Sequence, residues 1–134
     1  MEDTTIRIKG SYRLNVMSPE GDRVVGDSGW CENTVVNDGF KYYLVHALGA
    51  VAGSLQLTHM ALGTGSAPAV TTTQIPAEVG TRTAITFSTT TAGSKVLVAY
   101  ATFASGWHSS SGVGYNISNI GLYNSSSTGT LFAG

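Results

Sequence analysis

The chain has 134 residues, with seven Lys and Arg, eight Asp and Glu, and a formal net charge of −1. Nucleic-acid phosphates bind to basic faces, so this charge balance argues against DNA or RNA as a partner. The most apolar run, residues 42–57, is interrupted by His46, Ser54 and Gln56, which makes it too broken for a membrane span. The length fits one β-rich domain, residues 1–134, with a short N-terminal extension over residues 1–5.

The first predicted element is a β-hairpin at the N-terminal end. From Ile6 to Val16 apolar residues alternate with polar ones, which is the period of a half-buried strand. Residues 18–21, Ser-Pro-Glu-Gly, then fit a tight turn, because Pro presets its second position and Gly frees its fourth. A returning strand begins at Arg23 and continues past Trp30.

The second predicted element is an amphipathic helix near residues 38–49, the only helix that we expect to matter. Asn37 or Asp38 can cap its first turn, and Gly49 can end it. Spacings of three and four residues place an apolar stripe on one face, made by Phe40, Tyr43, Leu44, Ala47, Leu48 and Val51.

After the helix the sequence predicts only strands and loops. Residues 55–62 are apolar on both faces and predict a central strand. Further strands are predicted over residues 81–90, 95–103, 115–123 and 130–133. Seven or eight short antiparallel strands separated by turns favour a mainly β fold, either a β-sandwich or a small barrel.

The sequence does not bring together residues for catalysis or for metal binding. His46, His59 and His108 lie far apart, and no Asp or Glu is near any of them. Cys31, the single cysteine, has no His beside it and fits a small buried side chain. We therefore expect no enzyme activity, no cofactor and no metal.

Two features are candidates for partner contact. Arg7, Lys9 and Arg13 lie on one face of the first strand, where they form either a basic strip for an acidic partner or a solvated face paired with Asp22 or Asp27. Trp107 and His108 lie in a loop rich in Ser and Gly. Trp107 can anchor a contact or fold back over the core.

The charges are distributed unevenly along the chain. Twelve of the fifteen charged residues lie between Glu2 and Lys41, and none follows Lys95. A free soluble domain carries about a quarter charged residues over its whole surface. The charge-free region from Val96 onward therefore predicts core and intersubunit surface, with Asn119 and Tyr123 as further contact candidates.

Thr-His-Met-Ala-Leu-Gly at residues 58–63 is followed by Thr-Gly, and Ile-Gly-Leu-Tyr at 120–123 is followed by Gly-Thr-Leu at 129–131. These short motifs, in this order, resemble those of tailed-bacteriophage virion structural proteins. Upstream, Trp30 and Asn33 precede Val35 and Gly39 as in that family's lead into a helix. The family's acidic residue before Ile-Gly-Leu is replaced here by Asn119. The resemblance runs from about Trp30 to Ala133.

This resemblance implies a non-enzymatic virion part, assembled in the host cytoplasm. The first expectation is a capsid decoration, or cement, protein that binds the outside of the head as a homotrimer between major capsid protein subunits. The second is a tail component: a baseplate, collar or fibre-anchoring module. A third expectation, from a different class and independent of the resemblance, is a carbohydrate-binding β-sandwich, in which Trp30, Trp107 and Tyr115 would stack on sugars.

Overall fold

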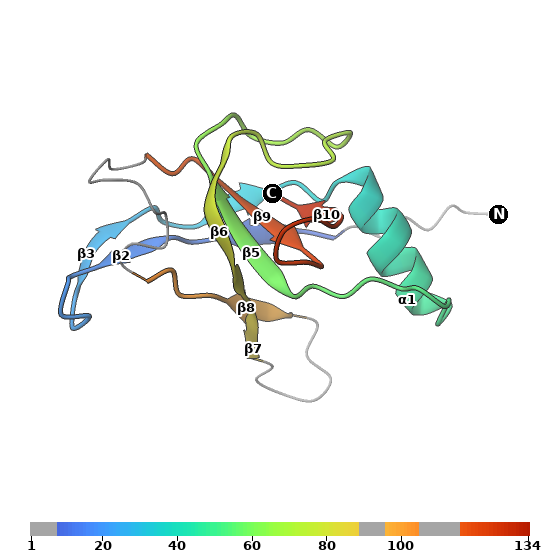
Figure 1. Ribbon diagram of the computed structural model, residues 1–134, viewed down its shortest axis with the longest axis horizontal. Coiled ribbons are helices and arrows are strands. Elements are labelled where there is room, and N and C mark those ends of the chain that lie inside the picture. The colour runs from blue at the N-terminus through green and yellow to red at the C-terminus, as the bar shows by residue number, and fades with distance from the viewer. Residues whose placement is uncertain (1–7, 89–95, 105–115) are drawn as a thin grey trace.

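The computed structural model describes residues 8–88, 96–104 and 116–134. Within these ranges the chain is mainly β, with ten short strands and one short helix, which confirms the predicted fold class (Figure 1). The described strands form one four-stranded and three two-stranded sheets, and they do not close into a barrel. The barrel alternative is therefore wrong.

The N-terminal hairpin is present, but it consists of two successive pairs of strands. The pairs are antiparallel: β1 (Gly10–Tyr12) with β4 (Cys31–Asn33), and β2 (Asn15–Met17) with β3 (Val24–Asp27). The predicted single strand is interrupted because the Leu14 N–H donates to the Ser28 hydroxyl, at 2.9 Å, instead of to a backbone carbonyl. At the far end the Gly21 N–H donates to the Ser18 carbonyl at 2.8 Å, which confirms the predicted turn.

The largest sheet has the strand order β10-β9-β5-β6, and all its neighbours are antiparallel. Its strands are β5 (His59–Gly63), β6 (Glu78–Ala84), β9 (Asn119–Tyr123) and β10 (Leu131–Ala133). The predicted strand at residues 55–62 corresponds to β5, which is central as expected. The predicted strands at residues 115–123 and 130–133 correspond to β9 and β10.

One face of this sheet is closed. Successive residues of a strand point to opposite faces, so alternate side chains of β5 and β9 share a face. The loop over residues 64–77 covers one of these faces through Ile75, which is almost fully buried. The core cluster lies there and consists of Val36, Ala61, Ile75, Tyr123 and Leu131.

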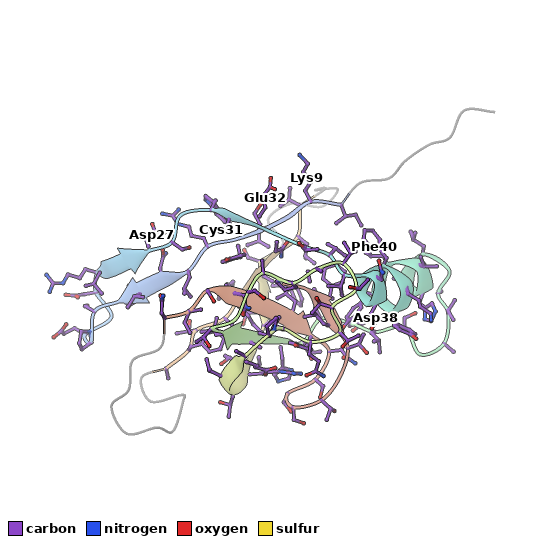
Figure 2. The ribbon with its side chains drawn as sticks, turned by 90° about the horizontal axis from the view of Figure 1, so that it is seen from above. Lys9, Asp27, Cys31, Glu32, Asp38 and Phe40 are labelled. Carbon is purple, nitrogen blue, oxygen red and sulfur yellow. The ribbon has the colours of Figure 1, made fainter. Side chains whose placement is uncertain are left out.

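The other face of the sheet carries Met60, Leu62, Ile120 and Leu122, which are opposite one another in the β5–β9 register. The N-terminal ribbon passes over this side of the sheet, as Figure 2 shows. A third ribbon, β7 (Thr86–Ser88) with β8 (Val98–Tyr100), continues from the end of β6. The closed face is therefore packed by the 64–77 loop, while the second face, on which Leu62 and Ile120 are also buried, faces two narrow ribbons.

The helix spans Gly39–Val45 as a π-helix (η1) and His46–Leu48 as an α-helix (α1). Asp38 stands at the N-cap, as predicted, but its side chain makes no capping hydrogen bond. The π turns have more than 3.6 residues each, so the predicted stripe does not stay on one face. Tyr43 is buried and its hydroxyl donates to the Thr130 carbonyl, whereas Leu48 is 85% exposed. The prediction that Leu48 packs inward is wrong.

Candidate assembly surface

The β2–β3 ribbon and its turn, residues 15–27, extend away from the four-stranded sheet and are called the arm. Figures 1 and 2 both show it at the end of the molecule opposite the helix. Its apolar side chains are about half exposed: Val16, Met17, Val24 and Val25. Val16 is opposite Gly26 and Met17 is opposite Val24, so Val25 is the extra residue of a β-bulge. The bulge displays an apolar side chain that no strand neighbour covers.

The base of the arm is held by an ion pair. The Arg13 guanidinium binds the Asp27 carboxylate through two hydrogen bonds, of which the Nε–Oδ1 bond is 3.0 Å long. This bond from Arg13, together with the Gly29 N–H, lowers the pKa of Asp27 to about 2. The Arg13 guanidinium also lies 5.9 Å from the centroid of the Trp30 ring. Arg13 therefore follows the solvated-face alternative, paired with Asp27 across the hairpin.

Of the other two residues in the predicted basic strip, only Lys9 lies in the described part of the chain. Lys9 is exposed, and its side chain extends from the same side of the ribbon as that of Glu32 (Figure 2). Arg7 lies outside the described residues. This face therefore does not present three free basic side chains. Arg13 is paired with Asp27, and the acidic side chain of Glu32 lies on the same side as Lys9.

A broad groove of about 2000 Å³ lies between the second face of the sheet and the ribbons. Its floor is formed by Met60, Leu62, Ile120 and Leu122, and one wall by residues 96–104. Leu97, Val98 and Tyr100 on that wall are about half exposed. Among the described lining residues only Lys9 and Arg13 carry a charge. The groove is thus an almost uncharged apolar recess, in which Leu62 and Ile120 on the floor are buried and the exposed apolar side chains lie on the wall.

The predicted contact residues Asn119 and Tyr123 do not lie on an accessible surface. Asn119 is 2% exposed and its side-chain amide donates to the Ser66 carbonyl at 2.9 Å. Tyr123 is fully buried, and its hydroxyl accepts a 2.9 Å bond from the Ile75 N–H. Both side chains hold the 64–77 loop on the closed face of the sheet. Their assignment as partner contacts is therefore wrong, because both side chains are buried in the core.

A buried charged cluster surrounds Arg82, which the sequence did not predict. The guanidinium is 2.7 Å from Glu78, donates to the Thr128 carbonyl at 2.6 Å, and lies 3.5 Å from the centroid of the Tyr123 ring. Burial acts to lower the pKa of Arg82, but the hydrogen bond and charge of Glu78 outweigh it and raise the pKa. Through the hydrogen bonds of Arg82, this cluster holds the turn between β9 and β10 against β6.

Glu78 and Arg82 meet because β6 is not regular. Residues four apart in a regular strand are separated by about 13 Å. Met60 is opposite Thr83 and Leu62 is opposite Val79, so β6 has two extra residues at this point. Gly80 in this bulge has a φ of 66°, which glycine adopts without strain. The sequence did contain a signal for this pair, since Glu78 and Arg82 are two of the three charged residues after Lys41.

Trp107 and His108 lie outside the described residues, so their roles stay predictions. Within residues 8–88, 96–104 and 116–134, no group of three His, Cys, Asp or Glu side chains is placed to hold a metal ion. None of the helices in these ranges has the length and apolar character to cross a membrane.

Nothing matches this chain in comparisons with protein-family models, with curated proteins and with solved structures.

Proposed function

We propose that this chain is a non-enzymatic structural part of a tailed-bacteriophage virion, and that it is a capsid decoration protein. In this role it binds the outer surface of the head between major capsid protein subunits. The proposal is supported by the ordered motifs between Trp30 and Ala133, which resemble those of virion proteins. It is also supported by a surface property that suits permanent assembly.

The observation that carries the proposal is the ratio of exposed to buried apolar side chains. Sixteen large hydrophobic side chains of the described residues are exposed, whereas the buried hydrophobic core contains ten residues. They occur on the arm, the helix and the wall of the groove, at Val25, Leu48 and Leu97 among others. Where such side chains are adjacent, as on the arm and along the wall of the groove, exposed apolar surface marks a site of interaction. A protein fixed in a shell has such surface covered for its whole life.

The charge distribution supports the same role. The described parts of the region after Lys95, residues 96–104 and 116–134, offer only uncharged polar and apolar groups. Contacts made by these groups need no desolvation of charge. Many copies on one shell also gain avidity, so that no single contact has to be strong.

The test is to locate the chain on purified virions by gold-labelled antibodies and negative-stain electron microscopy. The proposal predicts label distributed over the outside of the head. Label confined to the tail tip or collar would contradict it and favour a tail component.

A carbohydrate-binding role is favoured by one described residue, Trp30, whose side chain is 71% exposed. A glycan array with the wild type and with Trp30→Ala and Trp107→Ala tests it. Binding by the wild type that is lost in either variant would establish this role. Virion location and glycan binding are separate readouts.

A further inference from the structure

The arm carries more apolar surface than a free ribbon tolerates. An isolated two-stranded hairpin is marginally stable in water, and a third strand or a packed face is needed to hold it. In the arm, Val16 and Met17 line the chain's own groove, while Val24 and Val25 do not. The side chains of Val24 and Val25 are therefore left without a covering element in the described part of the chain.

The groove is too large for a small ligand. Sites for small molecules measure about 300–1,000 Å³, whereas this groove measures about 2000 Å³. Filled with solvent, it would hold about 65 water molecules at about 30 Å³ each, against an apolar lining. A polypeptide element is the occupant that matches this volume and this chemistry.

We propose that the groove of each copy receives the arm of a second copy. In this contact Val24 and Val25 pack against Leu97, Val98 and Tyr100 of the neighbour. Because the donor and acceptor surfaces differ, the contact is head-to-tail, and such contacts close into rings when the rotation permits. A ring uses two surfaces per chain, here the arm and the groove. The expected homotrimer is one such ring.

The proposed contact makes a second copy the partner of this chain. It does not depend on the proposed function, because the contact is tested on the isolated protein. Three lysine substitutions at similarly exposed positions separate the surfaces: Val25→Lys on the arm (57% exposed), Leu97→Lys in the groove (59%) and Val70→Lys as the control (52%). Val70 lies in the 64–77 loop and does not line the groove. Sedimentation velocity at micromolar concentration measures the association of each protein, and circular dichroism checks that each is folded.

The wild type is expected to sediment as an oligomer. Val25→Lys and Leu97→Lys are each expected to weaken association by at least about tenfold, and Val70→Lys to leave it unchanged. Should either variant not fold, Val24→Lys or Tyr100→Lys replaces it on the same surface. A monomeric wild type, or equal effects of all three substitutions, would overturn the proposal.

Mixing the two impaired variants tests the direction of the contact. The Val25→Lys chain keeps an intact groove and the Leu97→Lys chain keeps an intact arm, so the mixture is expected to form 1:1 dimers. If the arms instead paired with each other, mixing would restore nothing, and that outcome would refute the arm-to-groove contact. A wild-type protein that associates in solution as predicted but does not bind virions would count against the proposed function and leave the arm-to-groove contact standing.

Discussion

Replacement of Arg82 by Met tests how the hairpin of β9 and β10 is held. The side chain of Arg82 is 2% exposed, and it binds Glu78 through two hydrogen bonds of 2.7 and 3.0 Å. It also donates to the carbonyl groups of Ser125 and Thr128. Met retains most of the volume but leaves the Glu78 carboxylate without its partner.

The expected loss of unfolding free energy is about 3 kcal/mol. Breaking a buried ion pair by removing one partner costs about 3–5 kcal/mol, because the other charge is left uncompensated. The lower end applies here, since the side chain of Glu78 is 24% exposed and can regain some water. Changing Glu78 to Gln as well should restore part of the loss, because the uncompensated charge is then removed.

Urea unfolding followed by circular dichroism measures this loss. All proteins are compared at one protomer concentration, because association contributes to apparent stability. Arg13→Met is the matched control, because it breaks the ion pair with Asp27. The side chains of Arg13 and Asp27 are 42% and 34% exposed, so the loss of unfolding free energy should be much smaller. An Arg82→Met protein as stable as the Arg13→Met protein would refute the account of the cluster.

Two further predictions concern the closed face and the helix. Gly121→Ala should lower the unfolding temperature, because a Cβ there would lie 2.7 Å from Cγ2 of Ile75 and overpacking costs about 1–3 kcal/mol; an unchanged temperature would contradict this packing. Burial raises the pKa of Tyr43 to about 12, so its contribution to stability is complete below pH 10 and is lost as the pH rises through 12. The urea midpoint should fall between pH 10 and 12, and it should fall less steeply in Tyr43→Phe. Equal slopes in the two proteins would argue against burial of the Tyr43 hydroxyl.

The parts of the fold that were predictable are those in which the side-chain pattern and the backbone agree. Alternation over residues 6–16 identified the N-terminal ribbon, and apolar residues on both faces identified β5 as central. A glycine within a strand often marks a close approach of another group. Gly121 is such a glycine, because a Cβ there would lie 2.9 Å from Cε2 of Tyr123.

The parts that were missed depend on backbone irregularity and on contacts between distant segments. The π turns of Gly39–Val45 moved Leu48 out of the predicted apolar stripe. The bulge at Gly80 brought Glu78 within reach of Arg82, which regular strand spacing forbids. The groove could not be predicted because its floor and its walls come from residues throughout the chain, which only the tertiary fold brings together.

The measurement that tests the central claim most directly is a cryo-electron microscopy map of the virion, into which the chain can be fitted. The account predicts density for several copies on the outer surface of the head, between major capsid protein subunits, with the exposed apolar surface of the arm and the groove covered. A head without such density, or copies whose arm and groove both face solvent, would contradict it.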